Sequence, residues 1–100
     1  MKKVKITVIK ITTYPDLIKE YELPLELPCS LKVGMKFISL DANKPIGFCD
    51  TAWETLYPFV KDLANGKGHF YGDWMKNPYS AMVSCNDGFR PVTFYLEVLE

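Results

Sequence analysis

Three cysteines are the residues of this sequence best suited to chemistry. Cys29 lies in a loop between two turn signals, Cys49 directly precedes the longest helical pattern, and Cys85 ends an alternating strand pattern. Functional sites are commonly built at such ends of elements. The amides and positive dipole end of a helix favour a thiolate at Cys49, the form that attacks electrophiles and binds metals. The pattern indicates a shared thiol site, and the alternative is three separate packing residues.

Two more specific uses of the thiols are less well supported. Together with His69 the cysteines would form a Cys3His set, a combination found in structural zinc sites. Zinc ligands usually come in close pairs, whereas here 19, 19 and 15 residues separate successive candidates, which argues against zinc. A hydrolase built on Cys49 and His69 is disfavoured because the sequence shows no nucleophile elbow or oxyanion loop. We therefore assign no catalytic residue, no metal and no cofactor.

The loop over residues 69–79 is a second candidate site. It carries several rings among glycines and a proline: His69, Phe70, Tyr71, Trp74 and Tyr79. Aromatic rings supply apolar area in a small-molecule pocket, and polar groups such as the His69 imidazole fix the orientation of a ligand. We take His69 and Trp74 as candidate binding residues. The alternative is a loop folded over the helix, with its rings filling the edge of the domain.

The helical pattern over residues 51–65 is the element that must position Cys49. Apolar residues recur there at i, i+3 and i+4 spacing and make one stripe: Trp53, Leu56, Tyr57, Val60, Leu63 and Ala64. Thr51 followed by Glu54 fits a capping box, and Asn65-Gly66 fits a left-handed stop. Pro58 falls inside the pattern and predicts a kink, or else two short helices that meet there.

Four stretches alternate as strands do: residues 3–12, 35–40, 79–85 and 90–99. The first changes phase after Val8, which indicates a bulge or burial on both faces. Asn86-Asp87-Gly88 is the clearest turn signal and predicts a hairpin between the last two strands. The sequence thus predicts an α+β fold: an antiparallel sheet of about four strands with helix 51–65 packed on one face, and residues 1–100 as a single compact domain.

Composition restricts the partners. Twelve basic and twelve acidic side chains give no net charge, so no basic excess drives binding to nucleic acid or to an anionic membrane. The first residues alternate charged and apolar side chains, unlike an export signal, and no apolar run is long enough to cross a bilayer. An odd number of cysteines without such a signal favours reduced thiols. We expect a cytoplasmic protein that binds neither nucleic acid nor membrane.

Several of these residues also form a set of short motifs. They are Cys29-x4-Gly34-x2-Phe37, Pro45-x-Gly47-x-Cys49 before a helix with Trp53 and Pro58, and Cys85-x-Asp87 before a closing strand. From about Cys29 to the C-terminus the chain resembles a family of small uncharacterised bacterial and archaeal proteins of similar length. The resemblance implies that the three cysteines and Asp87 belong to one pattern. The chain departs from the family at Met35, where an acidic residue often stands, and at Asn86, where proline is frequent.

These observations lead to one favoured function and two alternatives. The favoured function is a thiol-centred binding or redox module that uses Cys29, Cys49 and Cys85, with Asp87 nearby. The first alternative is a small-ligand protein that uses the aromatic loop. The second is a homo-oligomeric or partner-binding subunit without catalysis, which the small size and an exposed sheet edge favour. Whether the protein is an enzyme stays open, because fold and composition do not determine function.

Overall fold

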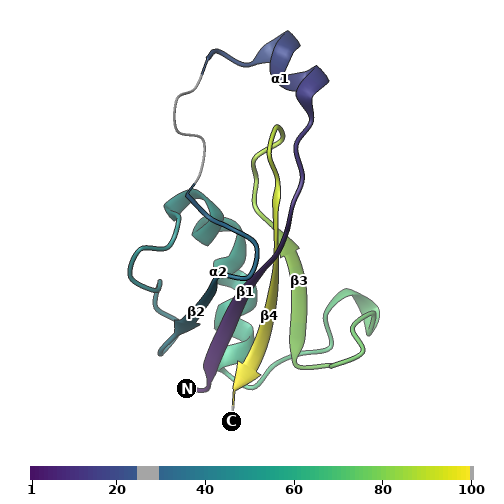
Figure 1. The fold of residues 1–100 in the computed structure, drawn as a ribbon. Coiled ribbons are helices and arrows are strands. Elements are labelled where there is room, and N and C mark those ends of the chain that lie inside the picture. Colours follow the sequence, from purple (N-terminus) through teal and green to yellow (C-terminus); the bar gives the residue numbers. More distant parts are fainter. Residues whose placement is uncertain (25–29, 100) are drawn as a thin grey trace.

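The computed structural model describes residues 1–24 and 30–99, in which four strands form a single sheet. The strands are β1 (Lys3–Ile11), β2 (Lys36–Ser39), β3 (Ser80–Ser84) and β4 (Val92–Leu99). All neighbours are antiparallel and the order is β2-β1-β4-β3, so the first and last strands lie at the centre (Figure 1). The predicted α+β fold is confirmed, and each strand begins and ends within two residues of its predicted bounds.

Strand β1 supplies much of the buried face of the sheet. Val4, Ile6 and Val8 alternate along it and are at most 1% exposed. They share one hydrophobic core with Phe94 and Leu96 of β4. The register between β1 and β4 shifts between Val8 and Lys10. The change of phase in the sequence predicted either a bulge or burial on both faces, and the structure has the irregularity, while Ile9 and Ile11 beyond it are exposed.

Helix α2 (Asp50–Ala64) covers the core face of the sheet, behind β1 and β4 in Figure 1. Its buried residues recur at helical spacing: Ala52, Leu56, Val60, Leu63 and Ala64. Pro58 lies in the exposed part of this single continuous helix, so the alternative of two helices meeting there is wrong. Tyr57, which was predicted in the apolar stripe, is 40% exposed, because it lies beside Pro58 on the outer side of the helix. The buried residues pack on the sheet, and this burial compensates for the hydrogen bond that proline deletes.

The two ends of α2 differ in how well the sequence predicted them. The helix ends at Ala64 with Asn65 as its C-cap, and Gly66 follows with φ +81°, the predicted left-handed stop. At the other end the capping residue is Cys49, and no side chain caps the helix. The predicted capping box of Thr51 and Glu54 is therefore wrong, because the helix already includes Asp50 and Thr51 lies within its first turn. Cys49 is thereby placed directly at the helix N-terminus.

Helix α1 (Pro15–Tyr21) stands away from the sheet and has no buried residue (Figure 1). The chain that leads to it continues the pairing of β1, because Thr12 and Tyr14 donate backbone hydrogen bonds to the carbonyls of Pro91 and Phe89, at 3.0 and 2.9 Å. Just after α1, the Glu22 side chain returns to the body of the molecule and pairs with Arg90. The segment 12–22 is thus attached to the turn between β3 and β4.

The loop between α2 and β3 contains a short 3-10 helix, η1 (Phe70–Gly72). Phe70 packs edge-on against Phe59 of α2, with ring centroids 5.3 Å apart, and joins the core. The Tyr71 hydroxyl donates a 3.0 Å hydrogen bond to the carbonyl of Met82 in β3. Because β3 is an edge strand, this bond occupies a carbonyl that would otherwise be available for pairing. The loop therefore shields part of the β3 edge.

Candidate functional site

A pocket of about 280 Å³ lies between the start of α2 and the connection from β3 to β4. We call it the thiol pocket. Its lining residues are Cys49, Thr51 and Ala52 from the helix side and Cys85, Asn86, Asp87, Arg90 and Val92 from the strand side. The two segments are brought together because α2 packs on the sheet with its N-terminus near the β3–β4 connection. Two thiols, a carboxylate and a guanidinium thus line the same space.

Cys49 is the residue immediately before α2. Its carbonyl accepts the N–H of Trp53 at 2.9 Å, which is the first bond of the helix. Its thiol makes no capping hydrogen bond. The side chain is half-buried and packs against the hydrophobic core. Cys49 therefore lines the pocket at the end of the helix where the N–H groups are directed, a setting that favours negative charge.

Cys85 follows β3, and two hydrogen bonds to β4 fix its position. Its N–H donates to the carbonyl of Val92 at 2.9 Å. In return, the N–H of Val92 donates to the Cys85 sulfur at 3.3 Å. An amide donor stabilises electron density on sulfur, and it also orients the side chain. Cys85, like Cys49, is half-buried and forms no disulfide.

Asp87 shapes the turn at the mouth of the pocket. Its Oδ1 atom accepts the N–H of Phe89 at 2.8 Å and the N–H of Arg90 at 3.2 Å. Such a carboxylate-to-backbone turn is the expected role of Asp in the motif Asn86-Asp87-Gly88. The bonds from two successive amides leave the carboxylate partly buried beside Cys85. Asp87 therefore combines a structural role in the turn with a position on the pocket wall.

Arg90 lines the pocket while its guanidinium is held by Glu22. Arg90 Nη1 donates to Glu22 Oε2 at 3.1 Å, and Nη2 lies 2.9 Å from Oε1 as an ion pair. The two side chains are only 20% and 11% exposed. The hydrogen bond to Glu22 is the main cause that raises the pKa of Arg90 above its ordinary value. The guanidinium is consequently charged throughout the physiological pH range.

The structure brings together three of the six predicted site residues: Cys49, Cys85 and Asp87 all line the thiol pocket. Cys29 lies outside the described residues. In the part of the chain that the structure describes, no three His, Cys, Asp or Glu side chains are grouped so that they could hold a metal ion. Cys49, Cys85 and Asp87 therefore line one pocket and are available to a ligand. These described residues are not grouped as the ligands of a metal ion would be.

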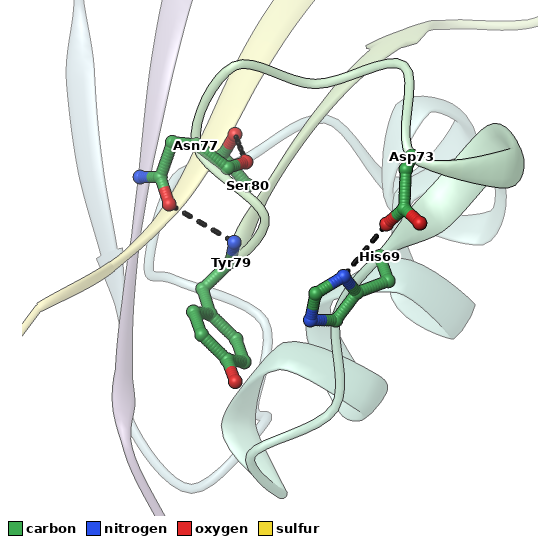
Figure 2. A network of polar contacts seen from close by, with 5 residues as sticks. All are labelled: His69, Asp73, Asn77, Tyr79 and Ser80. Carbon is green, nitrogen blue, oxygen red and sulfur yellow. Dashed lines mark hydrogen bonds and ion pairs between the residues drawn. The ribbon is translucent and has the colours of Figure 1, made fainter.

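His69 and Trp74 lie on the loop between α2 and β3 and do not line the thiol pocket. His69 Nδ1 is 2.6 Å from Asp73 Oδ1, and its ring stands edge-on to that of Tyr79 (Figure 2). Trp74 is 81% exposed and contacts the ring of Tyr71. Partial burial raises the pKa of the Tyr71 phenol. The predicted set thus divides into a thiol group and an aromatic-loop group.

Arg90, Thr51 and Asn86 line the thiol pocket but were not predicted as site residues. For Arg90 and Asn86 the available signal was their position in the same hairpin turn as Asp87. Thr51 was interpreted as a helix cap, and its exposed side chain is instead available to the pocket. Glu22, which holds Arg90, is 68 positions away in the sequence. No local pattern could have indicated that pair.

Fold and site together define a small α+β protein with a four-stranded antiparallel sheet and a pocket lined by two thiols. No protein-family model, no curated protein and no solved structure matches the chain. The resemblance to a three-cysteine family accordingly stays a prediction. Across residues 1–24 and 30–99, neither α-helix reaches the length and apolarity needed to span a membrane.

Proposed function

We propose that the protein is a thiol-centred binding module and that its site is the thiol pocket. One observation carries this proposal: Cys49 and Cys85, which are far apart in the sequence, line the same space of about 280 Å³. Both cysteines are free and half-buried, so neither is sealed in the core nor fully open to bulk water. The cytoplasmic location and reduced thiols expected from the sequence belong to the same proposal.

The lining indicates the chemistry of the ligand. Two thiols are soft ligands that favour soft, thiophilic groups over hard cations such as Mg²⁺ or Ca²⁺. Around them, Thr51, Asn86 and Asp87 provide hydroxyl, amide and carboxylate groups that can orient a polar part of the same ligand. Ala52 and Val92 add apolar surface. The proposed ligand is a small thiophilic molecule with hydrogen-bonding groups.

Phenylarsine oxide tests whether the two thiols act as one site. Its As=O group reacts with two thiols to form two As–S bonds and one water, and the product is stable only when both sulfurs reach the same arsenic atom. We expect one equivalent to bind, and either Cys49→Ser or Cys85→Ser to weaken binding by at least about tenfold, because one of two As–S bonds is lost. The equilibrium constant is measured by competition with a dithiol of known affinity.

Cys29→Ser is the matched control, since it removes a thiol that the proposal does not assign to the site. We expect this variant to bind phenylarsine oxide as the wild type does. If Cys85→Ser retained phenylarsine oxide binding and Cys29→Ser lost it, the site would belong to a different pair of thiols and the proposal would be refuted. Circular dichroism of each variant ensures that a loss of binding is not a loss of fold.

Self-association, the alternative that does not involve a ligand, stays a prediction. β2 is an edge strand, and several apolar side chains near it are exposed: Met35, Ile38, Leu40 and Ile46. Surfaces of this kind are compatible with pairing to another chain but do not identify it. The thiol pocket is the more specific feature because it joins chemically distinctive residues from two elements.

A further inference from the structure

A second pocket, of about 420 Å³, lies at the opposite end of α2 from the thiol pocket and shares no lining residue with it. It is lined by Lys2, Gly66, Asn77, Tyr79 and Val98. These residues come from the start of β1, the end of α2, the entry to β3 and the end of β4. We call this space the Lys2 pocket. Its volume is within the range of about 300–1,000 Å³ typical of small-molecule sites.

Backbone hydrogen bonds hold the walls of the Lys2 pocket in place. The N–H of Lys2 donates to the carbonyl of Ala64 at 2.8 Å, which attaches the start of the chain to the end of α2. The N–H of Val98 donates to the carbonyl of Tyr79 at 3.2 Å, which attaches β4 to the entry of β3. The pocket is therefore a product of the packed fold and not of one flexible loop, so it is formed before a ligand arrives.

The polar side chains of this pocket are hydrogen-bond donors without partners in the described chain. Asn77 Oδ1 accepts the N–H of Tyr79 at 2.9 Å, which directs the amide NH2 away from that bond (Figure 2). Neither this NH2 group, the Lys2 ammonium nor the Tyr79 hydroxyl forms a hydrogen bond or ion pair within residues 1–24 and 30–99. Among the described lining residues there is no carboxylate. The Lys2 ammonium and the Asn77 NH2 group can only donate, and one of them is a cation, so they match a ligand that is an anion.

The ring of Tyr79 adds an aromatic surface, and the neighbouring loop supports it. The His69 ring stands edge-on to it, with centroids 5.7 Å apart and planes at 77°. The His69 side chain is itself held by Asp73 at 2.6 Å (Figure 2). The backbone N–H of His69 donates to the carbonyl of Pro78 at 2.7 Å. Both His69 and Asp73 have left-handed backbones, with φ of +59° and +67°. Such conformations persist only where surrounding contacts determine them.

We propose that the Lys2 pocket binds a small anion that carries an aromatic ring. The anionic group lies beside the Lys2 ammonium and the Asn77 amide, and the ring lies against Tyr79 and Val98. A carboxylate or a phosphate ester satisfies the donors equally, so the shared feature is a negatively charged oxygen group attached to a planar ring. The site is independent of the thiol pocket, and its test does not involve the cysteines.

Titration with phenyl phosphate, followed by amide NMR of the full chain, tests the inference. We expect saturable shifts at the amides of Gly66, Tyr79 and Val98. Lys2→Gln should weaken binding about fivefold, the effect of removing one exposed charge contact, and Lys2→Arg should restore it. Lys10→Gln is the matched control, because it removes the same charge from an exposed position at the other end of β1 and should leave the affinity unchanged.

The ring is tested separately. Inorganic phosphate and phenol should each bind more weakly than phenyl phosphate, and Tyr79→Leu should lower the affinity for phenyl phosphate towards that for phosphate. The absence of saturable shifts at the three amides, an equal loss in Lys10→Gln, or equal affinities for phosphate and phenyl phosphate would each overturn the inference. Tyr79 is exposed at 45%, so its replacement leaves the core intact.

Discussion

At the scale of single residues, Gly68 determines how closely the loop after α2 approaches the entry to β3. A Cβ atom added at Gly68 would lie 2.3 Å from the carbonyl oxygen of Pro78 and 2.8 Å from the Tyr79 ring. The first contact is with backbone and cannot be relieved by a change of rotamer. We expect Gly68→Ala to lower the free energy of unfolding by about 1–3 kcal/mol, the usual cost of overpacking, as measured by urea denaturation.

Gly88→Ala is the control for that prediction. A Cβ atom at Gly88 would meet no heavy atom within 4 Å, and the residue is exposed in the turn between β3 and β4. Its replacement should change the free energy of unfolding by less than about 0.5 kcal/mol. Equal effects of the two substitutions would mean that the loop moves away from Pro78 at no cost, and the prediction would then be wrong.

At the scale of elements, Pro58 makes α2 less stable than its packing alone would allow. It lies in an exposed position of a continuous helix, where proline removes one hydrogen bond. Pro58→Ala should raise the free energy of unfolding by about 1–3 kcal/mol, because alanine restores the hydrogen bond and has a higher helix propensity. The entropy that the unfolded chain gains without proline offsets only part of this increase. The change is measured as a shift of the urea midpoint at constant m-value.

The matched control for Pro58→Ala is Lys61→Ala, another exposed position of α2. It brings the same new residue into the helix without restoring a hydrogen bond, so it should have little effect. A destabilised Pro58→Ala variant would instead show that a bend at Pro58 is needed for the helix to fit the sheet. The comparison therefore separates the helix propensity of proline from its influence on packing.

At the scale of the whole molecule, the arrangement of the strands predicts cooperative unfolding. β1 and β4 come from opposite ends of the chain and are neighbours at the centre of the sheet, and α2 contacts β1, β3 and β4. No strand can detach from the sheet without exposing part of the hydrophobic core that the elements share. We expect far-UV circular dichroism and the fluorescence of Trp53 to report the same urea midpoint, as a single two-state domain requires.

The variant Trp74→Phe makes this measurement specific, since it removes the exposed tryptophan and leaves Trp53, which packs against the core. Coincident transitions would support the prediction of a single domain. A fluorescence transition at clearly lower urea than the loss of circular dichroism would contradict it, because α2 would then separate from the sheet before the strands unfold.

Part of the candidate site was predictable because its residues mark the ends of elements. Cys49 was expected just before a helix, where it is observed, and Cys85 was expected to end a strand and directly follows β3. The helix begins at Asp50, one residue earlier than predicted, so Cys49 is the N-cap residue. The sequence could not predict the contact of Arg90 with Glu22 or the hydrogen bond from Val92 to the Cys85 sulfur. Each depends on which segments of the chain lie side by side.

Local periodicity in the sequence determined the kind and approximate length of the elements, because alternation and helical spacing of apolar residues depend only on neighbours along the chain. It also indicated the stop at Gly66 and an irregularity after Val8, though not that this would be a bulge rather than burial on both faces. The tertiary structure alone decided the strand order, the meeting of Cys49 with Cys85 in one pocket, and the grouping of Lys2, Asn77 and Tyr79 in another. These features depend on pairing and packing between distant segments, and many pairings are compatible with the same local pattern.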